Sequence, residues 1–222
     1  MPELNKNNYS GYLQNADTFE WMKSRGAEMR RLMTYYKCAM LEVETKFKVL
    51  DAEYSLQHDR NPINSIKTRL KQFSSIMEKL ERNHLPFTLS AIEENLNDIA
   101  GVRVICSFIE DVYTLADALL NQDDVQLIEK KDYIKKPKEN GYRSLHLIIA
   151  IPIFLENEKR MMKVEIQLRT IAMDCWASLE HQLHYKKDYE FDSESMEKLY
   201  ECAQLSTKLD TIMDELRKKN NI

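Results

Sequence analysis

Cations are concentrated around one expected helix start, in the pattern of a phosphate-binding site. Arg69 and Lys71 precede a helix that carries Ser75 and Lys79 in its first turns. A helix N-terminus offers unpaired N–H groups and a positive dipole end, so nearby cations complete a site for an anion. A solvated basic helix face is the other interpretation. The sequence has no Gly-rich loop followed by Gly-Lys-Ser/Thr, which argues against a P-loop enzyme.

A carboxylate and an arginine flank the start of an apolar stretch. Asp98 comes just before it, and Gly101 and Arg103 lie at its entrance. Such an aspartate can hold a divalent cation beside a cation that binds phosphate. A helix-capping aspartate and an edge-strand arginine would give the same pattern.

Glu165 and Gln167 form the third cluster, because they stand on the polar side of a stretch whose other side is apolar. A carboxylate there can complete a magnesium site with Asp98 or accept a proton from a hydroxyl group. The segment 141–146 leads into a neighbouring apolar stretch, and its Tyr142 offers a flat ring for a nucleobase. The alternative is that Glu165 simply faces solvent.

The elements that position these clusters follow from hydrophobic periodicity. Residues 162–168 alternate and predict a strand, whereas 145–151 are apolar on both faces and predict an interior strand. Asp111 and Thr170 are candidate N-caps. The expected helices cover 29–54, 74–83, 111–120, 170–185 and 196–216, and the expected strands cover 102–108, 125–129, 145–151 and 162–168.

Together these elements predict an α/β protein with a mixed central sheet of about four to five strands flanked by helices. We expect an N-terminal helical extension over 1–60, a core over 61–187 and a C-terminal helix over 188–222, within one compact domain. The stripe of apolar residues along 29–54 fits either packing on the core or a self-association face.

Composition narrows the class of protein. The 222 residues carry a net charge of −4, but the segments 66–82 and 129–143 are each +3, which favours a small polyanion over a long nucleic acid. The longest apolar run, 147–155, is broken by Pro152 and is too short to span a membrane. Residues 1–17 lack a signal-peptide pattern. Four separated cysteines indicate reduced thiols in a cytoplasmic protein.

The ordered clusters closely resemble those of the small alarmone synthetases, single-domain relatives of the synthetase half of the Rel, RelA and SpoT enzymes. The similarity covers roughly residues 20 to 215, and details around 61–62, 106–108 and 171–174 are closer to the RelP branch than to the RelQ branch. The matching stretches are 69–79, 98–103, 133–146 and 165–181.

This resemblance implies a nucleotidyltransferase-like fold and a magnesium-dependent activity. The β,γ-pyrophosphate of ATP would pass to the 3′-hydroxyl of GDP or GTP, giving ppGpp or pppGpp and AMP. The long enzymes' hydrolase domain has no counterpart, which implies synthesis without degradation. The family usually forms homotetramers, a role that the striped first helix and the last helix would fit.

By matching position, the resemblance also assigns roles to residues. Asp98 would bind magnesium, and Glu165 would contact the metal and deprotonate the acceptor hydroxyl. Arg69 and Arg103 would sandwich the adenine, and Tyr142 would stack on guanine. The remaining ATP-binding residues would be Lys71, Ser75, Lys79 and Arg143. The remaining residues at the GDP/GTP site would be Lys138, Asn140, His146 and Gln167, with His146 near the phosphates.

Two alternatives stay open. A related pyrophosphokinase would use an adenine nucleotide or a tRNA end as acceptor. A non-catalytic nucleotide sensor or single-stranded RNA-binding module is the second, although a dead enzyme has no need of both Asp98 and Glu165. Nucleic acid is otherwise not an expected partner.

Overall fold

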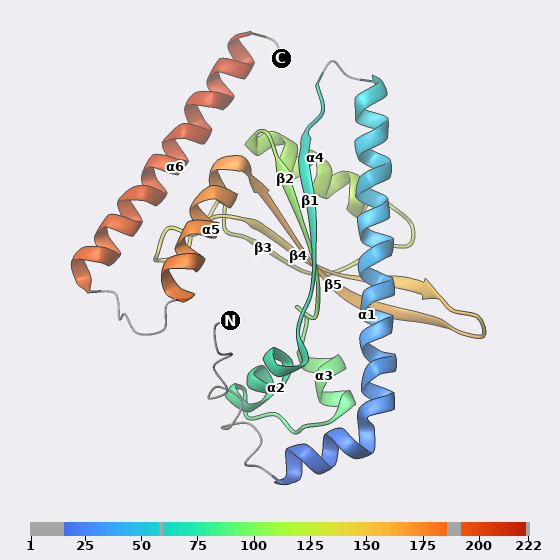
Figure 1. Ribbon diagram of the computed structural model, residues 1–222. Coiled ribbons are helices and arrows are strands. Elements are labelled where there is room, and N and C mark those ends of the chain that lie inside the picture. The colour runs from blue at the N-terminus through green and yellow to red at the C-terminus, as the bar shows by residue number, and fades with distance from the viewer. Residues whose placement is uncertain (1–15, 58–59, 186–191, 221–222) are drawn as a thin grey trace, which may run out of the picture.

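The structure, a computed structural model, describes residues 16–57, 60–185 and 192–220. Within these residues a five-stranded sheet lies between helices (Figure 1). The strands are β1 (Ile63–Leu70), β2 (Ala100–Cys106), β3 (Gln126–Asp132), β4 (Leu145–Phe154) and β5 (Lys159–Thr170). The helices are α1 (Ala16–Gln57), α2 (Phe73–Arg82), α3 (Leu89–Asn95), α4 (Ile109–Leu120), α5 (Ile171–Tyr185) and α6 (Ser193–Lys219).

The sheet is mixed, which confirms the predicted fold class. Its strand order is β1-β2-β5-β4-β3. The pair β2 and β5 is parallel, and the other three neighbouring pairs are antiparallel. The strand with alternating character, β5, therefore lies at the centre, between the parallel β2 and the antiparallel β4.

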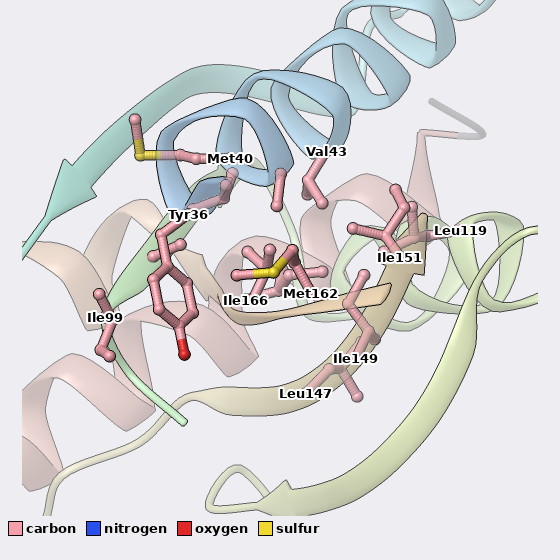
Figure 2. Close-up of a cluster of buried hydrophobic side chains, with 14 of the residues drawn as sticks. Tyr36, Met40, Val43, Ile99, Leu119, Leu147, Ile149, Ile151, Met162 and Ile166 are labelled. Carbon is pink, nitrogen blue, oxygen red and sulfur yellow. The ribbon is translucent and has the colours of Figure 1, made fainter. Parts of the chain in front are cut away.

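One face of the sheet carries the main hydrophobic core. The long helix α1 crosses this face. Helix α4 packs on the same face and is drawn further from the viewer in Figure 1. Phe47 and Val43 of α1 are fully buried, and Figure 2 shows Val43 beside Ile151 of β4. The apolar stripe of α1 is therefore used by the core, so a self-association face along this stripe is wrong.

The opposite face of the sheet is polar and is partly covered by α5, and α6 packs against α5 (Figure 1). A second, smaller cluster forms there from Trp176 and Ala177 of α5 with Leu199 and Ala203 of α6. Trp176 Nε1 donates a hydrogen bond to the backbone oxygen of Leu199 at 3.1 Å. Because α5 covers only part of the face, polar residues of β1, β2 and β5 stay accessible beside it.

The structure departs from the expected elements in the N-terminal half of the core. The segment 63–70 is an edge strand, β1, where we expected only the approach to a helix. Its polar residues include Lys67 and Arg69, which suit an exposed edge but hide the apolar alternation that predicts a strand. The seven-residue helix α3 was also not predicted; the hydroxyl of Thr88 caps it by accepting from Ala91 N.

The two proposed helix caps have different outcomes. Thr170 Oγ1 accepts from Met173 N at 3.1 Å and so caps α5, as predicted. Asp111 is not the N-cap of α4, because Phe108 holds that position. Asp111 lies three residues further on, where its carboxylate accepts from Phe108 N at 3.0 Å and from the Arg60 guanidinium. The expected boundary at 187–188 lies outside the described residues.

No helix in the described part of the chain is long and apolar enough to cross a membrane.

Candidate active site

Strand register places polar side chains in one row across the open face of the sheet. Lys67 of β1 pairs with Arg103 of β2, and Arg103 pairs with Gln167 of β5. Gln167 pairs in turn with His146 of β4. A second row, two residues away, runs from Arg69 through Gly101 to Glu165. The three predicted clusters therefore meet on one surface, although nearly 100 residues separate Arg69 from Glu165.

Asp98 connects the first two clusters. Its Oδ2 lies 2.8 Å from both Lys71 Nζ and Lys79 Nζ. Burial by itself would raise the pKa of Asp98, but the hydrogen bonds from the two lysines outweigh it and the pKa is lowered. The Asp98 carboxylate is therefore ionised at neutral pH, and it holds both lysines beside the start of α2.

Glu165 is the second carboxylate of the site and is partly buried on β5. Its Oε2 accepts from Gln167 Nε2 at 3.1 Å, and its Oε1 lies 3.4 Å from His146 Nδ1. Burial is the largest single influence and favours the neutral acid, but the contact with His146 and the hydrogen bond from Gln167 together lower the pKa of Glu165. The lowered pKa keeps this carboxylate ionised at neutral pH, which is the protonation state that a general base must have.

Gly101 leaves an open space between two arginines. Arg69 and Arg103 lie on adjacent strands on the same side of the sheet, two residue pairs apart. Gly101, directly opposite Arg69, has no side chain, and a Cβ added there would lie 3.5 Å from the Arg69 carbonyl oxygen. Guanidinium groups are planar and stack on aromatic rings, so the space between these two side chains suits a flat base.

The loop before β4 positions the predicted acceptor residues. Gly141 has φ of +85°, and a Cβ there would lie 2.4 Å from the Ala203 Cβ of α6, so only glycine allows this close approach. Asn140 Oδ1 accepts from Tyr142 N at 3.1 Å. Lys138 Nζ lies 5.0 Å from the centre of the Tyr142 ring. The loop is thus fixed from within and by α6.

A cleft of about 740 Å³ opens over these rows and is large enough for nucleotides. Seven predicted site residues line it: Arg69, Lys71, Asp98, Arg103, Tyr142, Glu165 and Gln167. Four others contact these: Lys79 through Asp98, His146 through Glu165, Lys138 through the Tyr142 ring, and Asn140 through the Tyr142 backbone. Ser75 lies in the first turn of α2, four residues before Lys79.

Arg143 lies in a different place from the one expected. It does not line the cleft and is only 7% exposed. Its Nη1 donates to Asp210 Oδ2 at 3.0 Å and to Thr207 Oγ1 at 3.1 Å, both on α6. Burial raises the pKa of Asp210. Arg143 therefore joins the loop to α6 and is turned away from the cleft.

Sequence reasoning missed a cation cluster at one end of the cleft. Asp174, in the first turn of α5, accepts from Lys67, Arg103 and Arg169. Arg169 Nη2 also donates to the hydroxyl of Tyr142 at 2.7 Å. The sequence shows a single acidic residue near the start of a helix that follows a strand with basic residues on one side. An acid at that place is already explained by its favourable interaction with the helix dipole.

The donor atoms present fit one magnesium ion. Asp98 Oδ1 is buried without a hydrogen-bond partner, although Oδ2 of the same carboxylate has two. Among the described residues no cluster of three or more His, Cys, Asp and Glu could hold a metal alone. Magnesium is commonly held by one or two carboxylates together with substrate phosphates, which matches Asp98 and Glu165 in one cleft.

The comparisons with known proteins identify the family. A family model described as "Region found in RelA / SpoT proteins" matches residues 68–190. The GTP pyrophosphokinase YwaC of Bacillus subtilis is 42% identical over 198 residues, covering 89% of this chain and 94% of YwaC.

Two crystal structures are also similar. Small alarmone synthetase 2 of B. subtilis has a TM-score of 0.79 at 42% identity, over 86% of this chain and 99% of that one. Small alarmone synthetase 1 of B. subtilis, bound to its product pppGpp, has a TM-score of 0.80 at 33% identity, over 86% and 97% of the two chains.

The fold, the cleft and these matches thus define a pyrophosphokinase with two carboxylates among the cations of its cleft. The chain belongs to the RelA/SpoT family and, within it, to the small alarmone synthetases.

Proposed function

We propose that the protein transfers the β,γ-pyrophosphate of ATP to the 3′-hydroxyl of GDP or GTP and releases AMP. The observation that carries the proposal is the pair Asp98 and Glu165 in a cleft otherwise rich in cations. A pyrophosphoryl transfer needs charge neutralisation and positioning more than covalent help, and this arrangement supplies both. A relative binds pppGpp as its product, which supports a guanine nucleotide as acceptor.

In this reaction the 3′ oxygen of the acceptor forms a bond to the β phosphorus of ATP. The bond from the β phosphorus to the oxygen that bridges to the α phosphorus breaks, and AMP leaves with that electron pair. Glu165 takes the proton of the acceptor hydroxyl, because its lowered pKa keeps it ionised. Lys71 and Lys79 neutralise phosphate charge from their positions around Asp98.

When bound, Mg²⁺ would neutralise charge on the transferred phosphates. Asp98 and Glu165 are the residues that would hold it. Arg69 and Arg103 would hold the adenine on either side of Gly101, and Tyr142 and Gln167 would hold the acceptor beside Glu165.

The test is a product assay with ATP labelled at the γ phosphate, Mg²⁺, and one acceptor at a time: GDP, GTP, ATP or tRNA. We expect AMP and a labelled guanosine tetra- or pentaphosphate with the first two acceptors. Label in a pyrophosphorylated adenine nucleotide distinct from ATP, or in tRNA, would instead support the related pyrophosphokinases. Bound ATP without transfer to any acceptor would support a nucleotide sensor.

The pH dependence of the reaction should depend on His146. Its contact lowers the pKa of Glu165, whereas burial raises it, so removing the imidazole should raise that pKa. In His146→Ala the acid limb of the kcat/KM profile should therefore move to higher pH. His146→Asn is the matched control, because its amide can still donate from the position of Nδ1. An unchanged acid limb in His146→Ala would contradict this assignment.

We also propose a homotetramer in the cytoplasm. The apolar stripe of α1 is buried, but α6 exposes a row of large apolar side chains that could contact other subunits. They are Met196, Tyr200, Leu205, Leu209, Ile212, Met213 and Leu216, each 40–61% exposed. Light scattering should give four times the 26.3 kDa chain mass, and Leu209→Lys should lower it. All four cysteines are free thiols, which suits the cytoplasm.

A further inference from the structure

We propose that Asp174 is a positioning residue, which fixes the direction of Arg103 and Arg169 and thereby shapes the ATP-binding end of the cleft. The inference rests on the proposed function, since it takes the ligand at Arg103 to be ATP. No predicted role covered Asp174.

Asp174 lies in the first turn of α5, where it contacts side chains of β1, β2 and β5. It lies four residues after the cap Thr170, and only 8% of its surface is exposed. Its Oδ1 accepts from Arg103 Nη1 at 3.3 Å and from Arg169 Nη1 at 3.1 Å. Its Oδ2 accepts from Lys67 Nζ at 3.1 Å. One carboxylate therefore holds three cations from three strands.

These cations repel one another in the absence of a shared partner. Burial, and then the positive charge of Arg169, lower the pKa of Arg103. The pKa of Asp174 is lowered although burial opposes this, because Lys67 and the two arginines surround it. The carboxylate thus remains charged at neutral pH and keeps the cations together.

The contacts of Asp174 link the residues assigned to ATP with the residues assigned to the acceptor nucleotide. Arg169, held at Nη1 by Asp174, donates through Nη2 to the Tyr142 hydroxyl at 2.7 Å and to Gln167 Oε1 at 3.1 Å. Arg103 Nε also donates to Gln167 Oε1, at 3.3 Å. A planar guanidinium fixed at two edges has one orientation, whereas a free one has many.

Charge and position predict opposite results when Asp174 is neutralised. Asp174→Asn makes the cleft more positive by one unit, so by Coulomb's law alone the anionic ATP would bind more tightly. If Asp174 acts by positioning, the released arginines lose their orientation and ATP binds more weakly. The sign of the change in affinity therefore separates the two roles.

Asp174→Glu also tests whether Asp174 acts by positioning, and it keeps the negative charge. Its extra methylene displaces the carboxylate by about 1.5 Å, so the three contacts of 3.1–3.3 Å cannot all persist. A positioning role predicts weaker ATP binding in this variant too, with less loss than in Asp174→Asn. A role through charge alone predicts wild-type affinity.

The control is Asp111→Asn. Asp111 is also a buried acid in the first turn of a helix, paired with the Arg60 guanidinium, but it does not line the cleft. We expect it to lower the thermal midpoint and to leave ATP affinity within a factor of about two.

The measurement is titration of each folded variant with a non-hydrolysable ATP analogue and Mg²⁺, without acceptor, beside steady-state kinetics. We expect the Kd of the analogue and the KM for ATP to rise tenfold or more in Asp174→Asn, and kcat at saturating ATP to change less. Equal or tighter binding in Asp174→Asn, or wild-type binding in Asp174→Glu, overturns the proposal. A wild-type protein that binds no analogue at all would instead count against the proposed function.

Discussion

Glu165→Gln should reduce kcat by about 100- to 10,000-fold, the range that a positioned general base contributes. The substitution keeps the size of the side chain and its place beside Gln167, but the amide cannot accept the proton of the acceptor hydroxyl. The loss should appear in kcat at saturating substrates and saturating Mg²⁺, where weaker metal binding by the variant no longer limits the rate.

The matched control is Glu158→Gln, which makes the same exchange on the turn between β4 and β5. Glu158 contacts Arg31 and Tyr35 and does not line the cleft, so its variant should retain nearly full activity. Raising the pH should not restore Glu165→Gln, because no titrating group remains at that position. If Glu165→Gln keeps more than a tenth of the wild-type activity, the assignment of Glu165 as the general base is wrong.

Asp98→Asn should be the second most damaging substitution, with a fall in kcat/KM of about 100-fold or more. The amide oxygen is a weaker ligand for Mg²⁺ than a carboxylate, and it no longer neutralises Lys71 and Lys79. The Mg²⁺ concentration that gives half-maximal activity should therefore rise, and excess Mg²⁺ should restore part of the rate.

A magnesium titration of initial rates measures both effects. Asp124→Asn is the control, because Asp124 is bonded to Lys46 at 2.8 Å and lies outside the residues that line the cleft. A variant with the wild-type magnesium dependence and a lower rate at every concentration would show that Asp98 acts through the lysines alone. The assignment of Asp98 as a metal ligand would then be wrong.

Residues with strong local patterns were predicted from the sequence. The alternation of Val164, Ile166 and Leu168 identified β5 and placed Glu165 on the opposite side, as the burial pattern has it. The steps of three and four along α1 identified that helix and its buried side. The predicted N-cap Thr170 is also confirmed, because the hydrogen bond of a capping side chain to the first helical turn is a purely local interaction.

Elements that depend on distant partners were not predicted. Few residues of β1 are buried, so the strand is stabilised mainly by its pairing with β2, which periodicity does not reveal. Arg143 was assigned from its place in a motif, yet its partner Asp210 lies 67 residues away on α6. Asp174 was overlooked for the same reason, because two of its three cations come from strands β1 and β2.

The sequence by itself determined which chemical groups are present and on which side of each element they stand, because those properties follow from side-chain type and a period of 2 or 3.6 residues. Only the tertiary structure decided which groups share a site. Parallel pairing of β2 with β5 brings Gly101 opposite Glu165, and the packing of α6 turns Arg143 inward. Register and helix docking are set by long-range burial, and no local stretch of the chain encodes that.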